Sequence, residues 1–120
     1  MATFTKVKLS GSTNGRGIAV AATATLGTTI HTAHATALDE IWLYANNIHS
    51  SAVTLTVEFG GVSVTKDIIQ QSIAATPSGL VLVCAGLVIQ GNATAKVVRA
   101  FCVTSASKVE IFGFVNRITA

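Results

Sequence analysis

Alternation of apolar and polar side chains is the main pattern along this chain. It is clearest over residues 53–59, where valine, leucine and phenylalanine alternate with threonine and glutamate. A period of two is typical of β-strands, because successive side chains point to opposite faces of a sheet. No long stretch has apolar residues at the spacing of three and four that an amphipathic helix requires. The pattern therefore predicts an all-β protein.

The segment from Leu38 to Asn47 predicts a central strand. It carries the only tryptophan and the only tyrosine of the chain, and it has apolar side chains on both faces. Trp42 and Tyr44 point to one side of such a strand. The residues expected on the other side are Ile41, Leu43 and Ala45. A strand that is apolar on both faces is expected inside a sandwich or beneath a second subunit.

A tight β-hairpin is predicted immediately afterwards. The alternating run 53–59 is followed by Gly60 and Gly61 and then by a second alternating run, 62–65. A two-residue glycine loop suits the tight turns of hairpins, and it keeps the two runs in register on both faces. Lys66 then falls on the apolar side of the hairpin. This edge is therefore expected to leave the core or to meet another subunit there.

The rest of the chain divides into further extended segments separated by polar and glycine-rich loops. A bulge is expected at Gly86, and another at Gly113 would bring Phe114 into the core with Val109 and Ile111. Loops are predicted at 11–17, 70–79 and 104–107, with a turn at Gly91-Asn92. Within the second loop, residues 70–76 could form a short helical turn or, equally well, the end of a strand. The further strands are predicted at residues 4–9, 18–25, 28–33, 80–90, 95–103 and 108–118.

Together these segments amount to about eight or nine strands with no helical crossover. The predicted fold is a two-sheet antiparallel sandwich, either of the jelly-roll or of the immunoglobulin-like type. A chain of 120 residues is expected to form a single domain, residues 1–120.

Charge is scarce in this chain and scattered. Only 11% of the residues are charged, which is less than half of the roughly 25% usual in soluble domains. Such a surface is expected where a protein is buried against copies of itself, so a homo-oligomer is predicted. The net charge of +3 is not gathered into a basic cluster. Direct binding of nucleic acid is therefore not expected.

No arrangement of side chains predicts an active site. Asp39 and Glu40 are neighbours on a strand, so they face opposite ways and cannot flank one substrate bond. His31 and His34 also face opposite ways, and His49 stands apart from them. Hydrogen-bonded or interfacial histidines are expected instead of metal ligands. The chain is predicted to have no enzymatic activity, no cofactor and no metal site.

The two cysteines and the apolar runs indicate the cellular compartment in which the protein is expected. Cys84 and Cys102 lie in apolar strands and are expected to be buried free thiols, as in a reducing cytoplasm. The amino terminus lacks the pattern of a secretory signal. The longest apolar run, residues 80–89, is about half the length of a membrane helix. No association with a membrane is expected.

Three segments resemble small virion proteins of tailed bacteriophages, and most of all the capsid decoration, or cement, proteins. They are residues 28–33, 38–47 and 53–61. The resemblance implies a non-enzymatic β-sandwich, made in the host cytoplasm, that forms homotrimers or other symmetric clusters on the outer surface of an icosahedral head. Its partner there would be the major capsid protein, whose capsomers it would hold together.

The expected interface residues are Trp42, Tyr44 and Lys66. Large amphipathic aromatic side chains are favoured anchors of protein interfaces, although both aromatics could instead fill the core of one subunit. A phage tail or head-to-tail component is an alternative function. Another is a glycan- or receptor-binding module, in which Trp42 and Tyr44 would stack on sugar. The five phenylalanines are expected to fill the core and to add nothing to such a platform.

Overall fold

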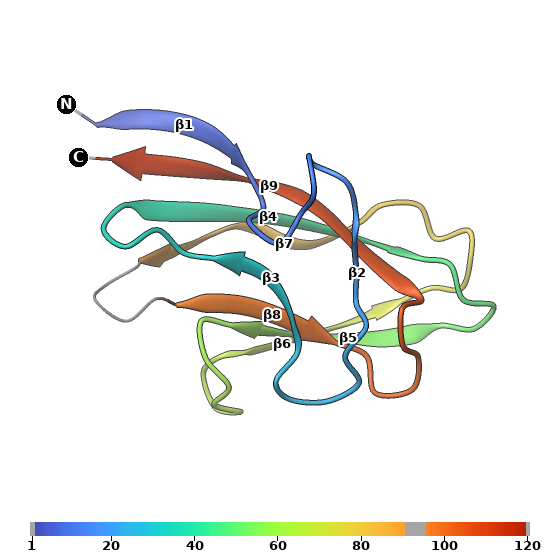
Figure 1. Ribbon diagram of the computed structural model, residues 1–120. Coiled ribbons are helices and arrows are strands. Elements are labelled where there is room, and N and C mark those ends of the chain that lie inside the picture. Colours follow the sequence, from blue (N-terminus) through green and yellow to red (C-terminus); the bar gives the residue numbers. More distant parts are fainter. Residues whose placement is uncertain (1, 91–95, 120) are drawn as a thin grey trace.

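The computed structural model describes residues 2–90 and 96–119, and Figure 1 shows their course. This part of the chain contains nine strands and no helix, so the predicted all-β sandwich is confirmed. The predicted turn at Gly91-Asn92 lies outside the described residues. The strands are β1 Thr3–Lys8, β2 Ile18–Ala19, β3 Thr28–Thr32, β4 Leu38–Asn47, β5 Val53–Phe59, β6 Ile68–Ile73, β7 Val81–Gln90, β8 Val97–Phe101 and β9 Val109–Thr119.

The strands form two antiparallel sheets that pack face to face. The five-stranded sheet has the order β1-β9-β4-β7, and the short β2 pairs with β9 beside β1. The four-stranded sheet has the order β3-β8-β5-β6. The amino and carboxyl termini lie side by side at one end of the molecule, because β1 runs along β9 (Figure 1).

The nested strand pairing identifies the sandwich as a jelly roll. Apart from β2, the first strand pairs with the last (β1 with β9), and the next pairs inward are β3 with β8, β4 with β7 and β5 with β6. Such nesting results when one long hairpin is rolled up into two sheets, as in jelly-roll domains. An immunoglobulin sandwich has its first strand in one sheet and its last strand in the other. Here β1 and β9 are neighbours in one sheet, so the jelly roll is the one of the two predicted topologies that is observed.

The central position of β4 is confirmed, and its bounds are those expected from the sequence. It lies between β9 and β7 and alternates regularly between buried and partly exposed residues. Ile41, Leu43 and Ala45 are fully buried between the sheets. They pack in one continuous core with residues of the opposite sheet such as Leu55 and Val57. Burial of this aliphatic face provides the main driving force that holds the sheets together.

The tight hairpin predicted at Gly60-Gly61 is wrong. β5 does form a hairpin, but its partner is β6, and residues 60–67 form the connection. The Asp67 carboxylate accepts a hydrogen bond from the Ser63 amide at 2.9 Å, and the Asp67 amide donates to the Ser63 carbonyl at 2.9 Å. These bonds coil residues 63–67 into a turn. An alternating pattern of four residues was too short to prevail over this local capping.

Two other boundaries need comment. Residues 68–73 form β6, so of the two possibilities left open for this segment the strand that ends in the loop is observed; it pairs with β5 from Ile68 opposite Glu58 to Ile73 opposite Val53. The strand predicted over 18–25 is reduced to β2. Beyond it, Thr25 and Gly27 are held by the buried Glu58 carboxylate, which accepts from the Thr25 hydroxyl and the Gly27 amide at 2.7 Å each. These long-range bonds replace strand pairing.

Bulges were predicted at Gly86 and Gly113. The prediction is confirmed at Gly86 and wrong at Gly113. Gly86 has φ of 77° and lies where the register between β4 and β7 shifts, so a bulge is present. The pairing of β9 with β4 passes through Gly113 without a shift. As a result Val115, and not Phe114, joins Val109 and Ile111 in the core.

The prediction of buried free thiols is confirmed. Cys84 lies on β7, and Cys102 follows β8 in the opposite sheet; neither forms a disulfide. Burial raises the pKa of the Cys102 thiol to about 11 and also raises the pKa of Cys84. Because the thiolate is the reactive species, both cysteines should be inert in the folded protein.

A thiol titration tests this protection. With Ellman's reagent at pH 8 we expect no reaction of the native protein over several minutes. After denaturation both thiols of each chain should react. A rapid reaction of the native protein would show that the sandwich opens at one of these sites.

Candidate functional site

The predicted interface residues Trp42 and Tyr44 lie on the outer face of the five-stranded sheet, where both are partly exposed. Each is paired across to β9 with a phenylalanine, Trp42 with Phe114 and Tyr44 with Phe112. The Trp42 and Phe114 rings stack with centroids 6.0 Å apart and planes inclined by 10°. We call these four residues the aromatic face. Sheet pairing thus gathers four aromatic side chains where the sequence alone suggested two.

The rings of the aromatic face are supported from their sides. The Lys6 ammonium lies 4.7 Å from the centroid of the Phe114 ring, an arrangement favourable for a cation–π interaction. Gly86 lies against the indole of Trp42, since a Cβ atom there would be 2.9 Å from Cζ2. Gly17 contacts Phe112 in the same way. Lys6, Phe114, Trp42 and Gly86 therefore form a row across β1, β9, β4 and β7.

Polar side chains beside the aromatic face are bonded to one another. The Glu40 carboxylate accepts from the Asn116 amide at 3.0 Å and from the Trp42 indole at 2.7 Å, and these two bonds lower the pKa of Glu40. At the other end of the face, the Asn46 amide donates to Glu110 at 3.2 Å. The face is therefore fixed in one arrangement before it meets any partner.

Phe112 and Phe114 were not expected on this face from the sequence. None of the five phenylalanines is fully buried, and Phe59 alone of them packs against the core, so the prediction that they fill the core is wrong for the other four. An unbroken period of two along β9 was the signal that could have found them. It places Val109, Ile111 and Val115 on one side, and Phe112 and Phe114 on the other.

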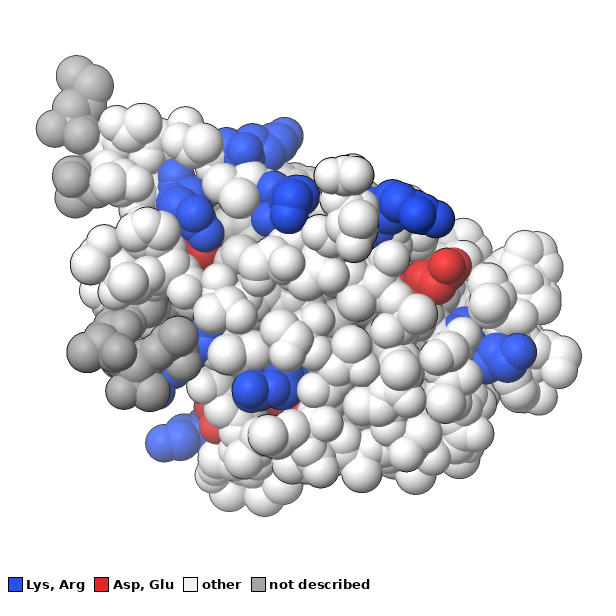
Figure 2. Space-filling model, viewed as in Figure 1, with Lys and Arg blue, Asp and Glu red and all other residues white. Residues whose placement is uncertain are grey.

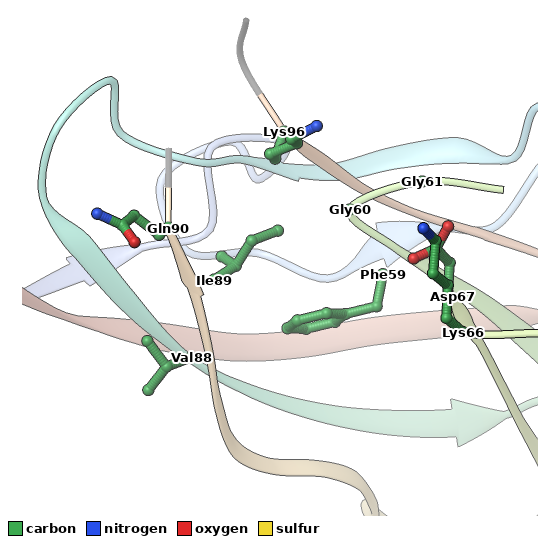
Figure 3. Close-up of a pocket in the computed structure, with 9 residues that line it drawn as sticks. All are labelled: Phe59, Gly60, Gly61, Lys66, Asp67, Val88, Ile89, Gln90 and Lys96. Carbon is green, nitrogen blue, oxygen red and sulfur yellow. The ribbon is translucent and has the colours of Figure 1, made fainter. Parts of the chain in front are cut away.

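Lys66 is not part of this face. It lies exposed in the loop between β5 and β6, on the other sheet, and not on the apolar side of a hairpin as predicted. There it lines a cavity of about 520 Å³. Figure 3 shows Lys66 and Asp67 on one side of this cavity and Val88 and Gln90 of β7 on the other.

Asp39 is the centre of a buried ionic network at one end of the sandwich. Its carboxylate accepts from Nε2 of His31 at 2.7 Å and from Nε and Nη2 of Arg117 at 2.8 and 3.1 Å. The His34 amide donates at 3.3 Å. Burial alone would raise the pKa of Asp39, but the hydrogen bonds from Arg117, His31 and His34 outweigh it, so the pKa is lowered.

His31 is held in one tautomer by this network. Its Nδ1 accepts a hydrogen bond from the Ser10 amide at 3.0 Å. The ring hydrogen therefore lies on Nε2, which donates a hydrogen bond to the Asp39 carboxylate. Both ring nitrogens are therefore occupied. With a relative exposure of 1%, the ring joins β3 of one sheet to β4 of the other and serves the architecture.

In the described part of the chain, neither the metal-ligating side chains nor the charged side chains form a further candidate site. Over residues 2–90 and 96–119, no group of three or more histidine, cysteine or acidic residues is placed to hold a metal ion. Nor does this part contain a helix long and apolar enough to cross a membrane. Figure 2 shows lysine and arginine in separate positions on a mostly uncharged face.

The fold and the aromatic face define the protein as a jelly-roll β-sandwich with a preorganised aromatic surface on one sheet. No family model matches the chain, and no curated protein or solved structure matches it.

Proposed function

We propose that this protein is a structural subunit of a tailed-bacteriophage virion. It is a capsid decoration, or cement, protein that binds the outer surface of the head and stabilises contacts between capsomers. Its partners are the major capsid protein and further copies of itself, in a trimer. The observation that carries the proposal is the aromatic face, a cluster of four large side chains on the outside of the five-stranded sheet.

The aromatic face suits attachment to another protein. Tryptophan and tyrosine anchor interfaces because they bury a large area with few rotatable bonds. Here the rings are held in place by Lys6, Gly86 and Gly17, so little conformational entropy remains to be lost on binding. Burial of such a face across a seam between capsomers stabilises the assembled head by mass action. Jelly rolls also occur widely in viral capsids, which is an analogy at the level of the fold.

Sugar binding is supported less well. Jelly rolls include lectins, and a stacking site needs an open ring face. The Phe114 ring has Lys6 on one flank and Trp42 on another, and Trp42 also has Gly86 beside it. The faces of these two rings are thus already in contact within the chain. This packing favours a protein partner over a sugar. A tail or head-to-tail component would use the same surface. Whether the protein binds purified heads or purified tails distinguishes this alternative from the proposal.

Light scattering, followed by binding to undecorated heads, tests the proposal. We expect a trimer that binds heads and raises the temperature at which they disrupt. The variant Trp42→Ala should bind heads roughly tenfold or more weakly, as expected for an interface hot spot. Tyr44→Glu provides a second probe in case Trp42→Ala unfolds. The control Val64→Ala changes a side chain that is 86% exposed in a loop and should bind normally.

A monomer that ignores heads would contradict the proposal. Binding to purified tails but not to heads would move the function to the tail. If the wild-type protein ignores heads but binds to a glycan array, and Trp42→Ala abolishes that binding, the sugar-binding alternative would replace the proposal.

A further inference from the structure

The margin of the five-stranded sheet formed by β7 carries an exposed apolar row. β7 pairs with β4 on one side, and in the described part of the chain no strand pairs with its other side. Leu80, Leu82, Leu87 and Val88 are 62%, 47%, 47% and 50% exposed. They account for four of the ten exposed large apolar side chains over residues 2–90 and 96–119. Leu82 and Val88 are paired across to Tyr44 and Glu40 on the outer face, whereas Leu87 is paired to Ile41 and lies on the opposite face of the sheet. We call Leu80, Leu82, Val88 and Ala85 the β7 row.

The opposite margin of the same sheet differs in charge. β1 exposes Lys6 and Lys8, which is a common protection against pairing with another chain. None of the ten residues of β7 is charged. An uncharged margin and a lysine-bearing margin on one sheet therefore indicate two different surroundings.

Pairing of β7 with another chain by a regular hydrogen-bond ladder is hindered. The register between β4 and β7 shifts twice, between Ile41 and Trp42 and between Leu43 and Tyr44. Such bulges disrupt the edge of a strand as a template for backbone pairing. Any contact of the β7 row with another chain is therefore expected to involve side chains.

We propose that the β7 row is the surface through which copies of this chain meet around a rotation axis. The inference rests on the oligomer of the proposed function and assigns a surface to it. Close to such an axis each residue lies near the same residue of its neighbours, so a charged side chain there would face like charges. β7 meets this condition, whereas β1, with its two lysines, does not. A different protein as partner would impose no such restriction.

The β7 row is continuous with the aromatic face but can be separated from it by mutation. Leu82 is paired across to Tyr44, and Ala85 to Trp42. The β7 row would therefore hold the copies together, while the aromatic face remains available to the capsid. Contact between the copies would also cover one flank of the aromatic face and fix its orientation.

Substitution of the β7 row by lysine tests the inference. We expect the double variant Leu82→Lys and Val88→Lys to have the mass of a monomer by light scattering, with thermal unfolding still cooperative. The matched control, Val64→Lys with Val103→Lys, adds the same charge at valines that are 86% and 68% exposed. It should keep the mass of the wild-type oligomer. A β7 variant that keeps the oligomeric mass would overturn the inference, as would a monomeric wild-type protein.

Crosslinking gives an independent positive readout. Because the native cysteines are buried, the variant Ala85→Cys places a single accessible thiol on the β7 row. Under mild oxidation it should form disulfide-linked dimers, whereas Val103→Cys should not. Absence of a crosslink with Ala85→Cys would count against the axis. Both experiments are independent of head binding, so they can succeed where the proposed capsid function fails, and the reverse.

Discussion

Replacing Asp39 with asparagine is expected to lower the free energy of unfolding by about 3–5 kcal/mol, the usual cost of breaking a buried ion pair. Asp39 is fully buried and receives hydrogen bonds from His31, Arg117 and the His34 amide. An asparagine amide group would point a donor at one of these donors and would remove the charge that compensates Arg117. Chemical denaturation at pH 7 measures the loss. The midpoint temperature of thermal unfolding should fall by roughly 10 °C or more.

Glu40→Gln is the matched control. It makes the same carboxylate-to-amide change one residue further along β4, on the outer face, and the amide oxygen can still accept from Trp42 and Asn116. We expect little change in stability. Equal losses in Asp39→Asn and Glu40→Gln would show that the buried network has no special importance.

The effect of Asp39 should depend on pH in one direction. Its pKa is lowered in the folded chain from the ordinary value of 3.8. The ionised carboxylate therefore stabilises the fold fully above about pH 4, and this contribution is lost as the pH falls through the folded pKa. The difference between wild type and Asp39→Asn should shrink in strongly acidic solution. A difference that grows there would contradict the assignment.

Gly113→Ala is the second change expected to have a large effect, with a loss of about 3 kcal/mol, at the upper end for overpacking. Gly113 lies opposite Leu43 in the middle of the β4–β9 pair. An added Cβ would clash with the carbonyl oxygen of Trp42 and approach its carbonyl carbon to 3.0 Å. Backbone atoms of a central strand cannot move aside as a flexible side chain can. The strands would have to separate locally.

Gly79→Ala is the control for the general cost of replacing glycine. Its Cβ would have no neighbour within 4 Å, but its φ is +66°, so only the strain of a left-handed backbone, about 1–2 kcal/mol, is expected. Equilibrium denaturation of both variants compares the two costs. A smaller loss for Gly113→Ala than for Gly79→Ala would mean that β9 does not approach β4 this closely. Gly113→Ala should also weaken head binding, because it displaces Trp42.

Much of the architecture could be predicted from the sequence because it depends on local alternation. The ten residues of β4 combine a regular period of two with enough length to specify both the strand and its two faces. Residues 62–65 show the limit of that rule. Their alternation was real, but the bonds between Ser63 and Asp67 stabilise a turn instead. Short patterns fail because a single pair of local hydrogen bonds can outweigh the strand preference of four residues.

The sequence by itself determined the fold class, the central strand with its aliphatic and aromatic sides, the buried thiols and the bulge at Gly86. Each of these follows from the period of a strand or from the conformational range of one residue. The tertiary structure alone decided the jelly-roll pairing, the grouping of Phe112 and Phe114 with Trp42 and Tyr44, and the network around Asp39. These features join residues far apart in the chain, and their register is set only when two sheets pack on one shared core.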